Sequence, residues 1–186
     1  MNDDTPGPPS DEPLVDLTDA ARTTAAIEER QHRRSLREQA EDTGTLAGTL
    51  HDLAEAAAVV SLHTTSDRRY QGRIVGVARD HVALTTRQQQ AVFVLLDCIA
   101  VVRPEPVLTA VRAAGDREPA QDLLLLERCA DWVGERPWLV VAVVGPGDLL
   151  GGHLHAVGED VVTLRPDGHG PATFVAASAI EAITRS

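Results

Sequence analysis

The chain contains the same pattern twice, eighty residues apart. Residues 72–84 read GRIVGVARDHVAL and residues 152–164 read GHLHAVGEDVVTL. Six positions match at an offset of 80: Gly72 with Gly152, Ile74 with Leu154, Val77 with Val157, Asp80 with Asp160, Val82 with Val162 and Leu84 with Leu164. The match continues at an offset of 81, where Phe93-Val94 corresponds to Phe174-Val175 and Ile99 to Ile180. A one-residue slip between matched blocks is typical of a loop insertion, so the sequence predicts one small β module that occurs twice.

The residues around these blocks predict the same order of elements in each module. Apolar and polar residues alternate with a period of two between turn residues, which indicates short strands. We expect strands near 58–65, 70–79, 81–88, 91–97 and 99–103, and again near 138–144, 150–158, 160–166, 172–177 and 179–184. A helix precedes each set, with one apolar face formed by Leu46, Leu50, Leu53 and Ala54 in the first and by Leu123, Leu126, Cys129 or Ala130, and Val133 in the second.

The sequence therefore predicts a mainly β protein with helices, of the α+β class. We expect two tandem five-stranded small barrels, each preceded by a short helix. Composition divides the chain further. The expected segments are a disordered acidic and proline-rich leader (1–15), a charged helical tail (16–43), a first helix-plus-barrel module (44–106), a linker (107–120) and a second helix-plus-barrel module (121–186).

Four residues of the repeated block have a structural interpretation. Gly72 and Gly152 lie early in the longest strand of each module, where a glycine permits the bend or bulge that curls a short sheet into a barrel. Asp80 and Asp160 lie at a tight turn, where an aspartate side chain can cap its own backbone. Neither pair requires a ligand.

A helix, a glycine-bent second strand, an aspartate turn and a Val-x-Leu strand together resemble the Sm-like small β-barrel. Residues 72–84 and 152–164 resemble the first Sm signature. The second signature ends in Ile-Arg-Gly, whereas this chain has LLDCI at 95–99 and AASAI at 176–180; the asparagine that Sm proteins place after the aspartate turn is also missing, with Ala83 and Thr163 near that position. Sm proteins hold uridine-rich RNA with those missing residues. The resemblance therefore implies the fold without the RNA pocket.

Residues 46–186 also resemble an actinobacterial family of two-barrel proteins whose role is not established. Its members combine an L-x-D-L-A-E helix with a first barrel that ends in V-R-P, followed by a linker and a second barrel. The matching residues here are Leu50, Asp52, Leu53, Ala54 and Glu55 for the helix, and Val102, Arg103 and Pro104 for the end of the barrel.

The charge distribution disfavours a broad surface for nucleic acid. The net charge is −11, and the first module is the neutral part of the chain. Binding along a phosphate backbone requires a basic face. A local cluster in the first module keeps RNA or DNA binding by a regulator as the alternative function, with Tyr70 available to stack on a base. Its candidate residues are Arg68, Arg69, Tyr70, Arg73, Arg79 and Arg87, of which Arg73 and Arg79 should share a side if no bulge intervenes.

Other candidate chemistry is weak. The glycine-rich segment 143–152 lacks the spacing of a dinucleotide-binding loop and precedes a strand pattern, so we interpret it as a hairpin. His153 and His155 lie two apart on a strand and could approach His169, which makes them weak candidates for zinc or nickel. We interpret them as part of an exposed face. We expect no catalytic residue, no metal and no cofactor.

Two cysteines and two tryptophans complete the residues of interest. Cys98 lies in a strand pattern and Cys129 in a helix pattern, and free buried thiols suit a reducing cytoplasm. Trp132 and Trp138 are expected to anchor the second helix to its barrel. The N-terminal residues contain no apolar signal core, and no apolar run approaches the roughly 18 residues of a membrane span.

The sequence thus predicts a soluble cytoplasmic protein that is not an enzyme. The function we expect is an interaction or assembly module, with a regulatory role as one form of it. Small barrels expose strand edges, and such edges accept additional strands. The expected partner is another protein or a second copy of this chain, in a homodimer or a higher oligomer, and not a membrane.

Overall fold

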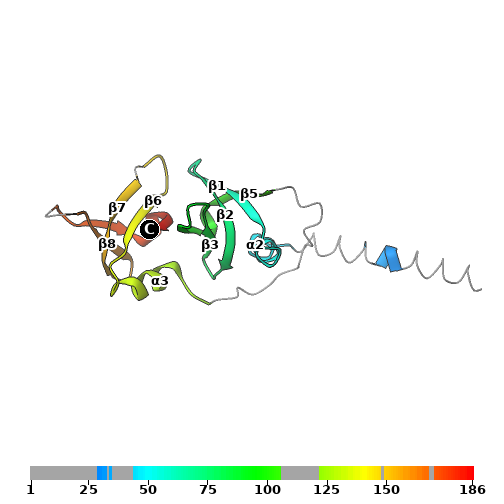
Figure 1. The fold of residues 1–186 in the computed structure, drawn as a ribbon, viewed down its shortest axis with the longest axis horizontal. Coiled ribbons are helices and arrows are strands. Elements are labelled where there is room, and N and C mark those ends of the chain that lie inside the picture. Colours follow the sequence, from blue (N-terminus) through cyan, green and yellow to red (C-terminus); the bar gives the residue numbers. More distant parts are fainter. Residues whose placement is uncertain (1–28, 33, 35–43, 106–121, 148, 168–169) are drawn as a thin grey trace, which may run out of the picture. The chain divides into compact units, whose positions relative to one another are not determined.

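The computed structural model describes residues 29–32, 34, 44–105, 122–147, 149–167 and 170–186 (Figure 1). The chain divides into two units, 1–42 and 43–186. The described residues of the first unit, 29–32 and 34, are helical and exposed. The predicted leader, the rest of the predicted tail and the predicted linker lie outside the described residues. The second unit contains residues 44–105, called the first repeat below, and the described residues of 122–186, called the second repeat.

Each repeat consists of one helix followed by five strands, with a 3₁₀ turn between the fourth and fifth strands. The first repeat contains α2 (Leu46–Glu55), β1 (Val59–Thr64), β2 (Arg69–Val77), β3 (His81–Thr85), β4 (Ala91–Leu95), η1 (Leu96–Cys98) and β5 (Ile99–Glu105). The second contains α3 (Leu125–Trp132), β6 (Trp138–Val143), β7 (Leu149–Val157), β8 (Val161–Arg165), β9 (Thr173–Ala176), η2 (Ala177–Ala179) and β10 (Ile180–Arg185). These bounds confirm the strand predictions to within a few residues.

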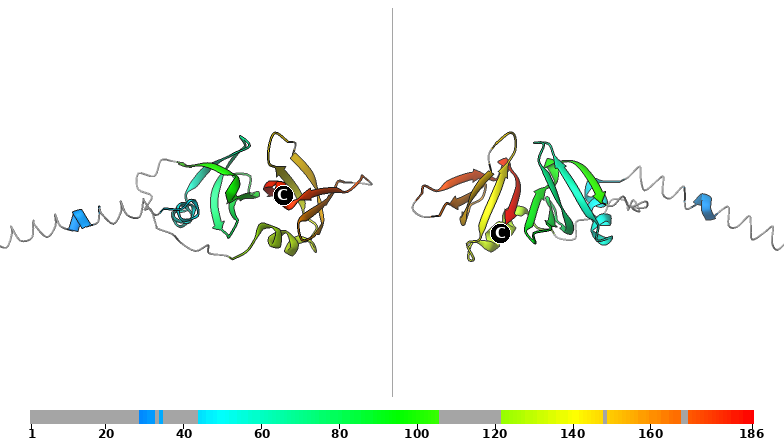
Figure 2. Two further views of the ribbon diagram at one scale, coloured as in Figure 1. Left: turned by 180° about the vertical axis from the view of Figure 1, so that it is seen from behind. Right: turned by 45° about the horizontal axis from the view of Figure 1, so that its top comes forward.

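The ten strands form one antiparallel sheet in the order β5-β1-β2-β3-β4-β10-β6-β7-β8-β9. The two repeats meet where β4 pairs with β10, with Phe93 opposite Ile183 and Ala91 opposite Arg185. The helices occupy equivalent places, because α2 packs against β2 and α3 against β7 (Figure 2). The sheet is not closed, and β5 and β9 are its two edge strands. The structure is therefore mainly β with short helices, as the α+β prediction requires.

Two apolar cores lie along this sheet, one for each repeat. The first is built from aliphatic side chains of α2 and β1 to β5, and the second from those of α3 and β6 to β10. Among the buried residues, Ala142 and Ala182 join the first core and Phe93 joins the second, and the half-buried Ala83, Ala91 and Leu95 also pack against the second core. Burying a leucine or valine side chain stabilises the fold by about 1.5–3 kcal/mol. The low aromatic content is therefore compatible with two separate cores.

The repeated glycines allow two strands to approach closely. A Cβ atom on Gly72 would lie 2.6 Å from the carbonyl oxygen of Thr85, and one on Gly152 would lie 2.9 Å from that of Arg165. The bulges themselves come later in the strands, where the pairing of β2 with β3 shifts between Ile74 and Gly76. The pairing of β7 with β8 shifts at the equivalent place. The glycines thus allow close approach of neighbouring strands, whereas the bulge that the sequence placed at them lies at a separate residue.

Helix α3 differs from its prediction in phase. Its buried face consists of Leu125, Cys129 and Trp132, whereas Ala130 is exposed and Leu123 precedes the helix. A run of four leucines is compatible with several helical faces, so spacing alone could not choose among them. The first repeat makes the choice, because the carboxylate of Asp80 accepts the backbone N–H of Leu125 at 2.9 Å.

Candidate functional site

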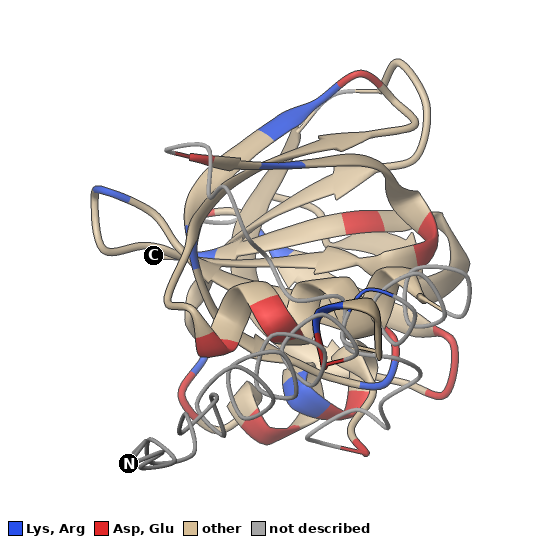
Figure 3. Cartoon of the chain, turned by 90° about the vertical axis from the view of Figure 1, so that its right-hand side faces the viewer, with Lys and Arg blue, Asp and Glu red and all other residues tan. Residues whose placement is uncertain are grey.

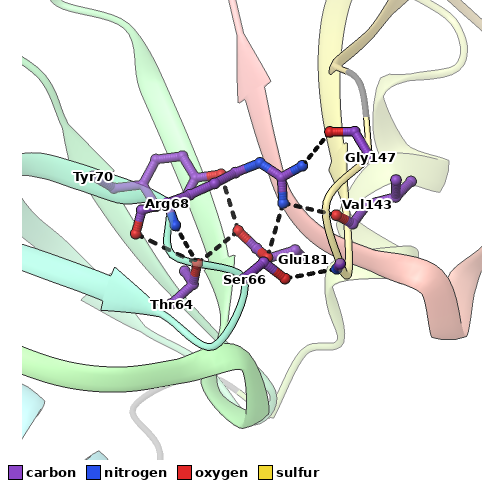
Figure 4. Close-up of polar contacts among 8 residues, drawn as sticks. Thr64, Ser66, Arg68, Tyr70, Val143, Gly147 and Glu181 are labelled. Carbon is purple, nitrogen blue, oxygen red and sulfur yellow. Dashed lines mark hydrogen bonds and ion pairs between the residues drawn. The ribbon is translucent and has the colours of Figure 1, made fainter.

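The contact between the repeats is centred on a buried glutamate of β10. The Glu181 side chain is fully buried, and Thr64, Arg68 and Tyr70 of the first repeat bind its carboxylate (Figure 4). Its carboxylate accepts the hydroxyl of Thr64 at 2.9 Å and that of Tyr70 at 3.4 Å. The guanidinium of Arg68 completes the set, with Nη1 at 3.1 Å from the second oxygen. A buried charge is tolerated only when it is paired and hydrogen-bonded, and Glu181 meets both conditions.

Arg68 also binds the opposite hairpin. Its Nη1 donates to the carbonyl oxygen of Val143 at 2.8 Å and its Nη2 to that of Gly147 at 2.6 Å. Next to it, the hydroxyl of Ser66 accepts the N–H of Gly145 at 2.7 Å (Figure 4). The planar guanidinium presents several donors in a fixed arrangement, so one side chain can join three acceptors. The turn between β1 and β2 is therefore held against the turn between β6 and β7.

Burial at this contact also affects the phenol of Tyr70. Loss of solvent, followed by the negative charge of Glu181, raises the pKa of Tyr70 to about 12 against the opposing effect of Arg68. Both burial and a nearby anion disfavour the phenolate. Tyr70 thus remains a hydrogen-bond donor over the whole neutral range.

Aromatic residues and a helix cap also join the repeats. The ring of Phe93 packs against Trp132 of α3 at 5.1 Å between centroids and against His81 at 5.8 Å. Asp80 accepts the ring N–H of His81 at 2.7 Å in addition to the N–H of Leu125. The Leu124 side chain does not cap α3. The carboxylate of Glu127 accepts the N–H of Leu124 at 2.8 Å, and Asp80 from the first repeat accepts that of Leu125. Asp80 caps a helix of the other repeat, not its own turn as the sequence predicted.

These contacts define the junction, the candidate functional site. The first repeat contributes Thr64, Ser66, Arg68, Tyr70, Asp80, His81 and Phe93, and the second contributes Leu125, Trp132, Val143, Gly145, Gly147 and Glu181, around the pairing of β4 with β10. Trp132 is buried here, as predicted for an anchor, and the guanidinium of Arg185 lies 5.0 Å from its ring centroid. Chemically, the junction joins two folded modules by strand pairing, a buried ion pair, hydrogen bonds to backbone groups and an aromatic contact.

The predicted nucleic-acid cluster is divided by the fold. Arg68 and Tyr70 belong to the junction. The side chain of Arg69 bonds Ser61 at 2.7 Å and lies 4.0 Å from Glu105. Arg79 lies 3.6 Å from Asp122. In Figure 3, basic and acidic positions are interspersed over the strands and loops of the described chain.

Two arginines of the cluster remain together. Arg73 and Arg87 line a surface hollow of about 370 Å³, together with Gln71 and Gln89. Arg79 does not share the strand of Arg73, because β2 ends at Val77 and a bulge follows Ile74. The condition for Arg73 and Arg79 to share a side is therefore not met.

The histidine candidates do not form a metal site in the described residues. Both ring nitrogens of His153 have partners, with Nδ1 3.0 Å from the carbonyl oxygen of Arg136 and Nε2 3.1 Å from Asp167. Its ring also packs edge-on against Trp138. His155 sits at the bulge of β7 and is half-buried, and His169 lies outside the described residues. Over the described ranges, no three His, Cys, Asp or Glu side chains gather to hold a metal ion.

The cysteines are buried and free. Cys98 lies in the 3₁₀ turn η1, not in a strand as predicted. Burial, followed by the charges of Glu181 and Asp97, raises the pKa of Cys98, and burial raises that of Cys129 to about 12. A thiolate is the reactive form, so neither is placed as a nucleophile. A strand, β7, follows the glycine-rich segment 143–152, which agrees with the hairpin interpretation.

Sequence reasoning missed Glu181. It lies in an otherwise apolar stretch, AIEAI, where the first repeat has Ala100 at the same position. The available signal was a difference between the copies: the strand has a charged residue in the second copy and alanine in the first. The same comparison would have suggested that one repeat makes a contact that the other does not.

No protein-family model matches this chain, and no curated protein matches it. Within the described ranges, the helices are too short or too polar to cross a membrane.

Proposed function

We propose that the protein is a non-enzymatic assembly module made of two Sm-like small barrels, which joins protein partners by adding strands to its sheet edges. The observation that carries the proposal is the pairing of β4 with β10. Through this pairing the chain already joins two similar modules by strand addition. Each repeat has its own core, which supports treating the repeats as separate modules.

The unpaired edges support the same function. Edge strands expose unpaired N–H and C=O groups and are commonly covered or interrupted in proteins that avoid association. Strand β9 carries the exposed side chain of Phe174, which makes this edge apolar as well as unpaired. Large exposed aromatic residues are frequent anchors of protein interfaces. A cytoplasmic location remains part of this proposal.

The test is to measure the mass and composition of the purified full-length chain by size exclusion with light scattering and absorbance at 260 and 280 nm. An assembly module elutes above the monomer mass of 19.9 kDa or with a stoichiometric protein partner, and 0.5 M salt does not change this. Phe174→Glu should abolish the association. Leu149→Glu, the same change at another exposed apolar residue, should preserve it. A monomer without a stoichiometric partner would contradict the proposal.

A second candidate, RNA or DNA binding, is favoured by the hollow that Arg73 and Arg87 share. Two guanidinium groups beside two amides can bind a phosphate. In the same experiment this function predicts a peak with excess absorbance at 260 nm that salt removes. The double variant Arg73→Ala/Arg87→Ala should lose it, whereas Arg79→Ala, which removes an exposed arginine outside the hollow, should not.

A further inference from the structure

The hollow of about 370 Å³ in the first repeat has a filled counterpart in the second repeat. The first three strands pair in the same register in both repeats, so the two places can be compared residue by residue. The corresponding residues are Val59 and Trp138 on the first strand, Gln71 and Gly151 followed by Arg73 and His153 on the second, and Arg87 and Asp167 after the third.

The second repeat fills this place with its own side chains. The ring of Trp138 packs edge-on against that of His153, with 5.2 Å between centroids. A Cβ on Gly151 would lie 3.0 Å from the indole, so the glycine leaves room for it. The Nε2 atom of His153 lies 3.1 Å from the carboxylate of Asp167. An aromatic ring and a carboxylate of the chain itself thus lie at the place that corresponds to the hollow.

The first repeat has neither the ring nor the carboxylate. Val59 has no ring where Trp138 has one, and Arg87 puts a positive charge where Asp167 puts a negative one. Arg73 and Arg87 both line the hollow, and within the described ranges neither guanidinium forms an ion pair. Two like charges that share one space repel each other, and an anion between them removes that repulsion.

The walls of the hollow offer apolar surface and a fixed position for one of the cations. Val59 and Val75 line it, and Val75 is 59% exposed. Arg87 lies in a tight turn, in which the N–H of Gln89 donates to the carbonyl oxygen of Thr86 at 3.0 Å. The turn therefore holds the backbone of Arg87 in place before any ligand arrives, which lowers the entropic cost of binding.

The acid beside the hollow does not neutralise its charge. Glu105 accepts the side-chain amide of Gln71 at 2.5 Å, and its other oxygen lies 4.0 Å from Arg69. Gln71 lines the hollow, whereas Arg69 and Glu105 do not. Glu105 is thus paired with an arginine outside the hollow, and the two arginines inside keep their positive charge.

We propose that this hollow binds a small aromatic acid, whose carboxylate lies between Arg73 and Arg87 and whose ring packs against Val59 and Val75. A guanidinium group binds a carboxylate through parallel hydrogen bonds and also stacks on aromatic faces. The volume of about 370 Å³ is within the range of small-molecule sites. This site goes beyond the proposed function, because it uses no strand edge, and its failure would leave the assembly function unaffected.

The test is isothermal titration calorimetry of the full-length chain with indoleacetate, which combines an aromatic ring with a carboxylate. Indole and acetate, the two halves of this molecule, are the matched probes. We expect saturable binding of indoleacetate at a single site on the chain. The affinity for each half should be at least about tenfold lower, because each half uses only one of the two parts of the hollow.

Two variants introduce the groups of the second repeat into the first. Arg87→Asp removes one cation and adds a carboxylate, so it should lower the affinity for indoleacetate at least about tenfold. Val59→Trp places a ring in the hollow and should lower the affinity to a similar extent by occupying the space. Arg79→Ala, which removes an exposed arginine outside the hollow, should leave the affinity unchanged. Circular dichroism confirms that each variant is folded.

Four results would overturn the inference. Equal affinities for acetate and indoleacetate would show an anion site with no place for a ring. Unchanged binding by Arg87→Asp would place the ligand elsewhere on the chain. The absence of saturable binding at about 1 mM indoleacetate would show that the hollow does not hold aromatic acids. Binding of a short oligonucleotide to wild type but not to Arg73→Ala/Arg87→Ala, without binding of indoleacetate, would assign the hollow to nucleic acid.

Discussion

The ion pair in the junction should lose more stability when Arg68 is removed than when Glu181 is removed. The side chain of Glu181 is fully buried, whereas that of Arg68 is 18% exposed. Arg68→Ala leaves a buried carboxylate with two hydroxyl donors and no cation. Removing one partner of a buried pair typically lowers the free energy of unfolding by about 3–5 kcal/mol, and we expect this range for Arg68→Ala.

The reverse change should be milder. In Glu181→Ala the Arg68 guanidinium keeps its hydrogen bonds to the carbonyl oxygens of Val143 and Gly147 and can turn toward water. The loss then resembles that of hydrogen bonds to a charged group, about 1.5–3 kcal/mol. The double variant Arg68→Leu/Glu181→Leu should be more stable than the sum of its single changes predicts, because it leaves no unpaired charge.

Urea unfolding, followed by circular dichroism and tryptophan fluorescence, measures these differences. With a slope of about 2 kcal/mol per molar urea, a loss of 4 kcal/mol moves the midpoint by about 2 M. The control is Arg79→Ala, because Arg79 and Asp122 are both exposed and such pairs contribute about 0–1 kcal/mol. The reasoning is refuted if Glu181→Ala is more destabilising than Arg68→Ala, or if Arg68→Ala matches Arg79→Ala.

Three further predictions concern residues other than Arg68 and Glu181. Tyr70 has a pKa of about 12 in the folded protein against an ordinary 10.0. Its stabilising contribution is therefore complete below pH 10 and is lost as the pH rises toward 12. The free energy of unfolding, measured from pH 9 to 12, should fall less steeply for Tyr70→Phe than for wild type. Cys98 and Cys129, with raised pKa values, should react with a thiol reagent at pH 8 only after unfolding, and labelling of the native protein would contradict their burial. Gly72→Ala should lower the free energy of unfolding by about 1–3 kcal/mol, because the new Cβ would lie 2.6 Å from the carbonyl oxygen of Thr85. The control is Gly76→Ala, where a Cβ would have no neighbouring atom within 4 Å, so the urea midpoint should change little.

The local features of the fold could be predicted from the sequence. Strand positions follow from the alternation of apolar and polar residues, which depends only on neighbours along the chain. The positions of Gly72 and Gly152 stood out because they recur in two copies of one pattern. The burial of Cys129 and Trp132 also follows from local apolar context. The strand positions and these buried residues rest on neighbours along the chain, and the glycines on a comparison of the two copies.

The candidate site could not be predicted in this way. The sequence cluster grouped Arg68 and Tyr70 with Arg73 and Arg87 because they are close along the chain, yet the first two are held by Glu181, more than a hundred residues away. Spacing also could not set the phase of α3, which depends on a carboxylate from the other repeat. Contacts between distant segments carry no periodic signal.

The sequence by itself determined that the chain has two copies of a helix and five short strands, because hydrophobic periodicity and turn residues act locally. Only the tertiary structure decided which edges of the two copies meet. The repeats share one order of elements, and the contact around the pairing of β4 with β10 contains residues that differ between them, such as Glu181 against Ala100. Those differences act through burial and pairing across the sheet, which exist only after the chain has folded.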